Sequence, residues 1–239
     1  KVTKPLEDEI VRERTMEENQ RLFFSAASHE LKTPIASARA LVEGMIAGVG
    51  EYKDHPKYLR ECMKTLDSQA RLVSEILEIV KLSGKETAPA INSLDLRELG
   101  NAVLAEYLPL AEQRGIVIQG VFPHVKVKAD WNLLQRVLSN LMANAIQNTP
   151  ECGVIKIETE KTATLHLSII NSGAHIPDEV LSRLFEPFFR LDTARTRHGT
   201  QTGLGLAIVK KALDRMAVPF SLENTAEGVR FNMELHITG

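Results

Sequence analysis

The chain has 239 residues, 44% of them hydrophobic and 25% charged, and its 29 basic and 31 acidic residues give a formal net charge of -2. This composition fits a globular protein of one or two domains with a proper core. The absence of a general basic field argues against nucleic acid as a partner, so any anion must be bound locally. The 2 cysteines are too few for a disulfide framework, and no apolar run approaches the roughly 18 residues of a transmembrane helix.

Helical periodicity dominates the first third of the chain. One helix is predicted from about Pro5 to Val49 and a second over about 57–82, with a turn rich in glycine and proline between them. The second helix carries apolar residues spaced alternately four and three apart, which is typical of a surface that packs against other helices. These residues, called the outer seam below, are Leu59, Met63, Leu66, Ala70, Val73, Leu77 and Val80.

Two helices joined by a short turn form an antiparallel hairpin, and one hairpin has too little core to stand alone. We therefore predict that two copies pair into a four-helix bundle, and an intramolecular coiled coil or stalk is the alternative. Residues 83–93 are mostly small and polar and include a proline, which predicts a boundary there between two domains, at 1–86 and at 92–239.

The pattern beyond this boundary predicts an α+β sandwich with helices on one face of a mixed sheet. Helices are expected over 94–114, 131–148, 177–185 and 204–216. Strands are expected over 116–122, 125–129, 153–160, 164–171, 219–224 and 229–237.

His29, in the segment SHELKTPI (residues 28–35), is the first candidate for chemistry. At about 100° per residue, the apolar stripe of the first helix lies opposite His29, so His29 and Thr33 one turn later should both face solvent. Glu30 can accept the Nδ1 proton and leave Nε2 as a nucleophile, whereas Pro34 removes a backbone hydrogen bond and tends to kink the helix. A plain surface histidine is the alternative. The stripe comprises Leu31, Ile35, Ala38, Val42, Met45 and Val49.

Paired asparagines mark the helix over 131–148. Asn140 and Asn144 are four residues apart and so project from one face. An asparagine oxygen is a good ligand for Mg²⁺, which takes one or two protein oxygens together with phosphates. This pair alone does not distinguish between a metal site and two amides that cap neighbouring strands.

Glycines at the entrance to a later helix suggest an anion site. Gly203 and Gly205 allow close backbone approach, and the N–H groups of a helix N-terminus attract phosphate, although glycine also simply begins helices. The polar stretch just before them can either close on triphosphate charge or remain a solvated loop. Its arginines are Arg190, Arg195 and Arg197.

Two further segments follow strands or turns. Asn171 at a predicted strand end and Gly173 in the turn after it can contact the edge of a base, because glycine leaves room for a ring. The aromatic patch FEPFF (residues 185–189) is more typical of core than of a ligand site. We expect Phe185 and Phe188 to anchor the polar stretch that follows.

The order and spacing of these segments resemble a known family. SHELKTPI resembles the phosphoacceptor box of sensor histidine kinases of two-component systems, and NLMANAIQNTP, NSGAHIP, FEPFFR and TGLGLAIV are similar to that family's asparagine, first glycine, phenylalanine and second glycine boxes, in the same order. The resemblance covers about residues 20–239. Three segments are similar in sequence to the vancomycin-resistance sensor kinases of the VanS type, namely FFSAASHELKTPI, EYKDHPKYLREC and NTPECGVI.

The resemblance implies a hairpin that dimerises, followed by an ATP-binding domain of the histidine kinase, gyrase and Hsp90 type. It also implies that His29 is phosphorylated, that Glu30 orients it, and that Thr33 positions water when the regulator is dephosphorylated. ATP and Mg²⁺ are the implied cofactors, with Asn144 on the metal and Asn140 supporting the phosphate site. Backbone donors to the phosphates would come from Gly203, Leu204 and Gly205.

The resemblance further implies a homodimer and, as partner, the receiver domain of a VanR-like response regulator. In that family a sensor and two transmembrane helices precede this region, so we expect the chain to be the cytoplasmic portion of a bacterial membrane protein. Its charged start, without an initiator methionine, is consistent with a longer protein. Control of vancomycin-resistance genes and a dual role as kinase and regulator phosphatase are the expected functions. A phosphatase-dominant homologue with weak kinase activity and an ATP-binding conformational switch are the alternatives, and a scaffolding coiled coil is disfavoured by the paired asparagines.

Several residues depart from the family pattern. Asn171 stands where an aspartate usually accepts from the adenine amino group, and an amide accepts with one uncharged oxygen, so we expect weaker ATP binding. His175 replaces a glycine and narrows the room beside the ring. Gln147 and Asn148 stand where a basic residue and an aromatic are frequent. Gln201 takes a position often filled by glycine.

Overall fold

The computed structural model describes residues 3–48, 50–84, 88–191 and 202–238, without the side chains of 3–13 and 15. The chain divides into two compact units, a helical hairpin that runs to Leu77 and an α/β unit that begins at Glu78. The domain bounds 1–86 and 92–239 stay a prediction.

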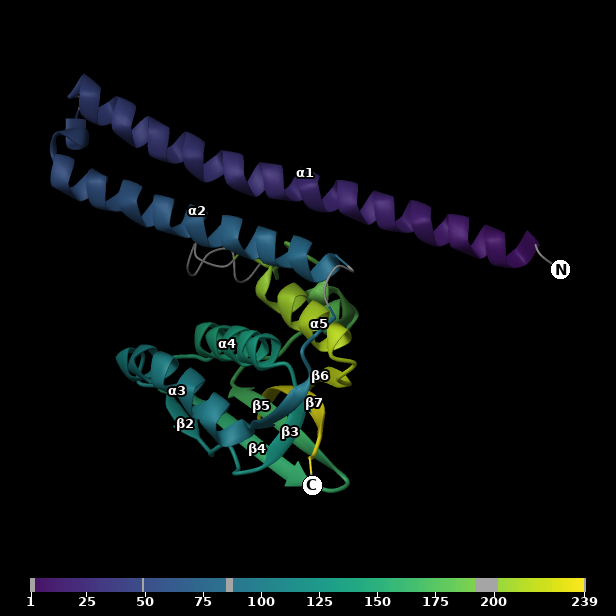
Figure 1. The fold of residues 1–239 in the computed structure, drawn as a ribbon. Helices are drawn as coiled ribbons and strands as arrows, with labels where there is room; N and C mark the ends of the chain where they lie inside the picture. The colour runs from purple at the N-terminus through teal and green to yellow at the C-terminus, as the bar shows by residue number, and fades with distance from the viewer. Residues whose placement is uncertain (1–2, 49, 85–87, 192–201, 239) are drawn as a thin grey trace. The chain divides into compact units, whose positions relative to one another are not determined.

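The hairpin consists of α1 (Thr3–Ala47), the short 3₁₀ helix η1 (Gly50–Lys53) and α2 (His55–Ser83). α1 and α2 run antiparallel beside each other (Figure 1). α1 continues as one helix through Pro34, although the carbonyl of Glu30 loses its usual N–H partner there. The turn closes because the ring of Tyr52 lies against Gly44, where an added Cβ would stand 2.8 Å from the ring Cγ.

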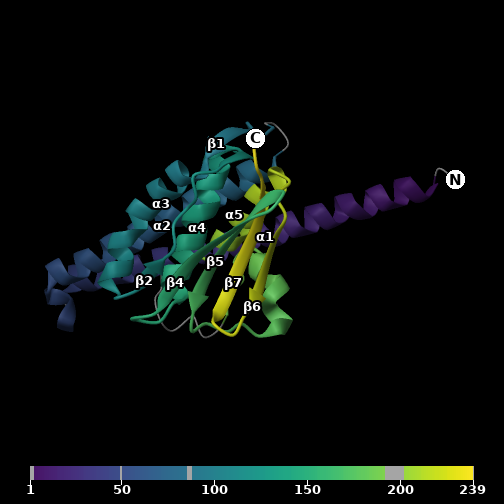
Figure 2. The ribbon, with the colours of Figure 1, turned by 90° about the horizontal axis from the view of Figure 1, so that it is seen from below.

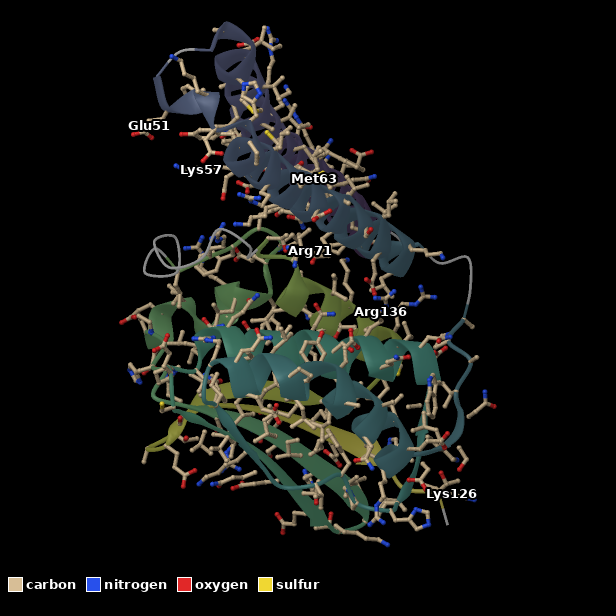
Figure 3. All side chains as sticks on the ribbon, turned by 90° about the vertical axis from the view of Figure 1, so that its left-hand side faces the viewer. Glu51, Lys57, Met63, Arg71, Lys126 and Arg136 are labelled. Atoms are coloured by element: carbon tan, nitrogen blue, oxygen red, sulfur yellow. The ribbon has the colours of Figure 1, made fainter. Side chains whose placement is uncertain are left out.

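The buried side of the hairpin is offset by one residue from the outer seam. On α2, Cys62 and Leu72 are buried, and each precedes a seam residue. The outer seam itself is exposed in this single chain; Met63, labelled in Figure 3, keeps 57% of its surface. The predicted stripe of α1 divides in the same way, because Met45 is buried whereas Ile35 is exposed. Each helix therefore has an inner apolar side and an outer one about 100° away.

The α/β unit contains a five-stranded mixed sheet in the order β2-β4-β5-β7-β6, in which β2 and β4 are parallel and the other pairs are antiparallel. Figure 2 shows these strands side by side in that order. The predicted fold class is confirmed. The elements are β1 (Asn92–Asp95), α3 (Leu96–Gln113), β2 (Val117–Gln119), β3 (Lys126–Ala129), α4 (Trp131–Asn148), β4 (Val154–Lys161), β5 (Thr164–Ser172), η2 (Asp178–Phe185), α5 (Gly205–Arg215), β6 (Phe220–Asn224) and β7 (Gly228–His236).

The hydrophobic core lies between one face of this sheet and the helices α3, α4 and α5. Side chains alternate between the faces of a strand, and the register places Ile157, Ile169 and Phe231 in one buried row across β4, β5 and β7. The opposite face carries Lys156 and Arg230 on either side of Ile170.

Three predicted elements differ from the structure. Of the strand expected over 116–122, only Val117–Gln119 forms β2. Leu94 was expected in a helix but belongs to β1, because it pairs with Val127 of β3 in a separate two-stranded sheet. Asp95 then caps α3 by accepting from the backbone N–H of Arg97 at 2.9 Å, which is a frequent role of aspartate before a helix. The segment at 178–185 is a 3₁₀ helix rather than an α-helix.

Candidate functional site

The side chain of His29 on α1 keeps 80% of its surface exposed. This agrees with the expectation from helical periodicity that it faces away from the predicted apolar stripe. An imidazole this exposed does not pack in the core, and both ring nitrogens are accessible to a reactant. The geometry therefore allows nucleophilic chemistry at His29.

Glu30 and Thr33 accompany His29 on α1. The distance from His29 Nδ1 to Glu30 Oε1 is 3.9 Å, which is within ion-pair range but too long for a hydrogen bond. Thr33 is exposed, and its hydroxyl lies 3.3 Å from the backbone carbonyl oxygen of His29 one turn earlier. Both side chains thus lie close enough to act on a group attached to His29 after small rotations.

In the α/β unit, the paired asparagines of α4 meet the second glycine box. The Nδ2 of Asn140 donates to the carbonyl of Arg136 at 2.9 Å, one turn back on α4 (Arg136 is labelled in Figure 3). Its Oδ1 lies beside Gly205, where an added Cβ would approach to 3.1 Å. The glycine therefore leaves open the space beside an amide oxygen at the start of α5.

The second glycine box is also joined to the phenylalanine box. Phe188 N–H donates to the carbonyl of Gly203 at 2.9 Å. Gly203 has φ +72°, and an added Cβ would lie 2.9 Å from Phe188 Cα, so both its conformation and its surroundings require glycine. Phe185 packs edge-on against Phe220, with ring centroids 5.3 Å apart. The hydrogen bond between Phe188 and Gly203 joins residues on either side of the predicted polar stretch, and the anchoring role expected for Phe185 and Phe188 stays a prediction.

Leu204 and Gly205 begin α5. The Leu204 side chain is fully buried, so only its backbone can contribute to a ligand site. No side chain caps this helix start within the described residues, and the first N–H groups of a helix lack partners inside the helix. The start of α5 is thus suited to an anion.

The first glycine box lies at the end of β5. Asn171 is 92% buried, as its 8% exposure shows, and it pairs with Ile155 and Val229, which places it on the helix-covered face. Gly173, with φ +73°, packs against the ring of Pro150 just after α4, where an added Cβ would lie 3.0 Å away. The asparagine box and the first glycine box are therefore neighbours.

The loop within this box is held by polar contacts. Gly173 N–H donates to the carbonyl of Glu227 at 3.3 Å, and the hydrogen bond from Lys156, at 2.7 Å, lowers the pKa of the Glu227 carboxyl. Asn224 accepts from the N–H of Ile176 at 3.0 Å and donates to its carbonyl at 2.7 Å. The exposed His175 lies inside this held loop.

Asn144, the expected metal ligand, is half-buried near the end of α4. Its Oδ1 accepts from Asn148 Nδ2 at 2.7 Å, and its backbone carbonyl accepts from the same nitrogen at 2.8 Å. Arg114 donates to the carbonyls of Ile146 and, at 3.0 Å, of Thr149. A guanidinium at this position complements the negative end of the α4 dipole.

The arginines of the polar stretch are only partly described. Arg190 is half-buried, and its Nε is enclosed without a hydrogen-bond partner among the described residues. Arg195 and Arg197, together with Gln201, lie outside the described residues.

Sequence reasoning missed three residues that shape this site. Asn148 was noted only as a departure from a family pattern, whereas Arg114 and Asn224 gave no local signal because their partners are 35 and 48 residues away in the chain. A residue that organises a distant backbone segment carries no periodicity or spacing that reveals it.

The oxygen donors fit a Mg²⁺ ion bound chiefly through a nucleotide. Among the described residues no group of three or more histidine, cysteine, aspartate or glutamate side chains forms a metal cage. Magnesium keeps several waters and takes one or two protein oxygens with phosphates, so the amide oxygen of Asn144, one turn along α4 from the Asn140 oxygen that lies beside Gly205, is compatible with such an ion. Within the same residues no helix has the length and apolarity to cross a membrane.

Two family models match the chain. Residues 19–85 match the His Kinase A (phospho-acceptor) domain, and residues 129–239 match the histidine kinase-, DNA gyrase B-, and HSP90-like ATPase family. Sensor protein VanSB of Enterococcus faecalis is 48% identical over 232 residues, which cover 96% of this chain and 52% of that protein. The chain thus spans about half the length of this relative.

Solved structures of histidine kinases are also similar to this chain. The histidine kinase ThkA, in complex with the response regulator protein TrrA, is 27% identical with a TM-score of 0.73, and the match covers 99% of this chain and 67% of that one. The catalytic domain of ThkA alone is 30% identical with a TM-score of 0.53, covering 61% of this chain and 95% of that one.

Proposed function

Because the chain belongs to the histidine kinase family, we propose that it phosphorylates its own His29 from ATP and passes the phosphoryl group to an aspartate of a response regulator. The observation that carries this proposal is the 80% exposed imidazole of His29, in a chain whose other unit gathers the asparagine and glycine boxes. The exposed histidine supplies the nucleophile, and the α/β unit supplies the donor.

Phosphoryl transfer to His29 needs one lone pair and one proton acceptor. The lone pair of Nε2 forms a bond to the γ-phosphorus while the bond from that phosphorus to the β–γ bridging oxygen breaks, and ADP leaves with those electrons. Glu30 can take the Nδ1 proton after a rotation that shortens the present 3.9 Å. In the second step an aspartate oxygen of the regulator bonds to phosphorus while the bond from phosphorus to Nε2 breaks, so that His29 recovers its lone pair and Glu30 returns the proton to Nδ1.

The residues of the α/β unit bind and orient the nucleotide in this proposal. Asn171 and Gly173 contact the adenine, the start of α5 and Gly203 donate to phosphate, and Asn140 supports that phosphate site. Bound Mg²⁺ would supply charge neutralisation on the triphosphate, held by Asn144. Further positive charge comes from Arg190, Arg195 and Arg197. We expect weak ATP affinity, because Asn171 is uncharged.

The outer seam supports a homodimer. Leu66 and Leu77 keep 55% and 62% of their surface in the single chain, and a contiguous apolar stripe of this length is unusual on a surface that remains in water. A second hairpin would cover it with four-helix packing. The partner in signalling is then the receiver domain of a response regulator, which we propose is VanR-like.

Thr33 favours a second activity on the same helix. Its exposed hydroxyl lies one turn from His29, where it can orient a water toward the phosphorylated aspartate of a docked regulator. We propose that the protein also removes phosphate from the regulator, so that it has both kinase and phosphatase activity. A phosphatase-dominant form with weak kinase activity is the alternative that the uncharged Asn171 favours.

The wider setting follows from the relatives. We propose domains at 1–86 for dimerisation and phosphotransfer and at 92–239 for catalysis, in the cytoplasmic portion of a bacterial membrane protein. The genes controlled are proposed to be those of vancomycin resistance, on the similarity to VanSB.

Incubation with ³²P-labelled ATP and Mg²⁺ tests the kinase activity. We expect acid-labile, alkali-stable phosphate on the protein, lost in His29→Gln and retained in His55→Gln, because His55 is an exposed histidine of the same hairpin that lies outside SHELKTPI and has no threonine one turn later. An unlabelled wild-type protein, or equal labelling of His29→Gln, would refute the proposal.

The phosphatase activity needs a separate experiment. Thr33→Ala should label normally with ATP but leave a phosphorylated regulator intact for longer than the wild-type protein does, because only the water-orienting hydroxyl is lost. Equal rates of regulator dephosphorylation in both proteins would argue against the role of Thr33.

A further inference from the structure

Asn148, the last residue of α4, makes two hydrogen bonds with one nitrogen. Its Nδ2 donates to Oδ1 of Asn144 at 2.7 Å and to the backbone carbonyl of Asn144 at 2.8 Å. Resting on the metal role proposed for Asn144, we propose that Asn148 is a positioning residue that keeps the amide oxygen of Asn144 in the orientation that Mg²⁺ requires.

The backbone contact decides which way both amides point. A carbonyl oxygen only accepts, so the atom of Asn148 that faces it must be the NH₂ group. The same NH₂ group then faces the side chain of Asn144, which must present its oxygen, because its own NH₂ group would place donor against donor. Either amide could flip if the two formed an isolated pair, and the backbone carbonyl removes that freedom.

The selected orientation suits a hard cation. An asparagine offers Mg²⁺ only its oxygen, and an amide oxygen has two lone pairs. One accepts from Asn148 and the other remains for the metal. The side-chain entropy of choosing this orientation is then lost on folding rather than on binding, which favours affinity.

The residues after Asn148 keep it in place. Thr149 is 1% exposed, and both its N–H, at 2.9 Å, and its hydroxyl, at 2.7 Å, donate to the carbonyl of Ala145. Arg114 binds the carbonyls of Ile146 and Thr149. The last turn of α4 is thus fixed from both sides, so Asn148 meets Asn144 with little motion.

The donor in this arrangement is a departure from the family pattern. Asn148 stands where a frequent aromatic residue of the family pattern would carry no amide donor. A residue that supports a metal ligand from behind commonly changes metal affinity about 10–100-fold when it is lost.

Calorimetric titration of ATP into the full chain, in Mg²⁺ and separately in EDTA, tests the proposal. Asn148→Ala should weaken ATP binding about tenfold in Mg²⁺ and leave binding in EDTA unchanged. Asn132→Ala is the matched control, since it removes an exposed asparagine from the first turn of the same helix, and it should bind ATP as the wild type does.

A double-mutant cycle separates positioning from simple helix stabilisation. If Asn148 acts through Asn144, the Asn148→Ala change should have no further effect in an Asn144→Ala protein. Equal losses in both backgrounds, an equal loss in EDTA, or wild-type affinity of Asn148→Ala in Mg²⁺ would each overturn the inference.

The metal role itself can fail separately. If wild-type ATP binding is the same in Mg²⁺ and EDTA, or if Asn144→Ala keeps the difference, then the proposed role of Asn144 and the inference fall together. If Asn144→Ala abolishes the difference and Asn148→Ala does not reduce it, only the inference is refuted.

Discussion

Gly203 and Gly205 are two residues apart, yet the structure gives them different reasons to be glycine, and alanine at each position separates those reasons. Gly203 has φ +72°, and its added Cβ would lie 2.9 Å from Phe188 Cα and 3.0 Å from the Phe189 carbonyl. Gly205 lies inside α5 with a conformation that alanine adopts, and its Cβ would meet only the amide oxygen of Asn140 at 3.1 Å.

The expected free energies differ accordingly. A side chain in the left-handed region costs roughly 1–2 kcal/mol, and crowding against backbone that cannot move adds roughly 1–3 kcal/mol. Gly203→Ala should therefore lower the free energy of unfolding by about 2–5 kcal/mol. At Gly205 alanine gains up to about 1 kcal/mol of helix propensity, which offsets the contact with Asn140, so stability should stay within about 1 kcal/mol of wild type.

Nucleotide affinity should respond in Gly205→Ala without any loss of stability. The new methyl fills the space beside the Asn140 oxygen at the start of α5, and loss of one charge-assisted hydrogen bond to phosphate, about 1.5–3 kcal/mol, weakens ATP binding roughly 10–100-fold.

Urea unfolding followed by tryptophan fluorescence measures the stability of the α/β unit, which contains both glycines, because the single tryptophan, Trp131, begins α4. Gly203→Ala should lower the urea midpoint by about 1–2 M, and Gly205→Ala should leave it nearly unchanged. An unchanged midpoint for Gly203→Ala would refute the steric reasoning. Wild-type ATP affinity of Gly205→Ala would refute the placement of phosphate at the start of α5.

Three further predictions concern the dimer, the end of α4 and acid stability. Leu66→Glu should raise the dimer dissociation constant roughly 100-fold in sedimentation experiments, because each subunit then buries an unpaired carboxylate; Lys64→Glu, away from the outer seam, should not, and an intact Leu66→Glu dimer would contradict the seam interface. Arg114→Ala should lower the free energy of unfolding by about 2 kcal/mol in urea, because two carbonyls at the C-terminus of α4 lose their cation. Arg114→Lys should restore part of that free energy. An unchanged free energy of unfolding in Arg114→Ala would show that these hydrogen bonds contribute no stability. Desolvation raises the pKa of Asp95, but the hydrogen bond from the Arg97 N–H and the nearby His124 together lower it by more, so the net shift is downward. The ionised Asp95 carboxylate therefore stabilises the fold above the ordinary carboxyl pKa of about 4. This stabilisation is lost as the pH falls through the lower pKa of the folded state. Asp95→Asn should therefore lose less stability on acidification than wild type, and parallel pH profiles would contradict this.

Part of the fold and of the site was available from the sequence alone. The helix at 131–148 has the predicted bounds, and the strands predicted over 153–160 and 164–171 form within one residue of those bounds. His29 could be placed opposite the apolar stripe of its helix from the turn angle alone. These features depend on residues within one element, whose side-chain directions follow from backbone geometry.

Other features depended on packing. The sequence revealed an apolar stripe on α2 but not that the neighbouring stripe, with Cys62 and Leu72, is the one buried in the hairpin, because two stripes 100° apart are equally periodic. Leu94 entered a strand because Val127, 33 positions later, was there to pair with it.

Thus the sequence determined the elements, the exposed nucleophile and the types of side chain available for a nucleotide. Only the tertiary structure brought Asn140 against Gly205, Phe188 against Gly203 and Gly173 against Pro150, because these contacts join segments whose separation along the chain carries no information about distance. Even Asn148, one turn from Asn144, became informative only when its donor was seen between a carbonyl and an amide oxygen. Periodicity gives the direction of a side chain, whereas its partner is decided by which elements pack together.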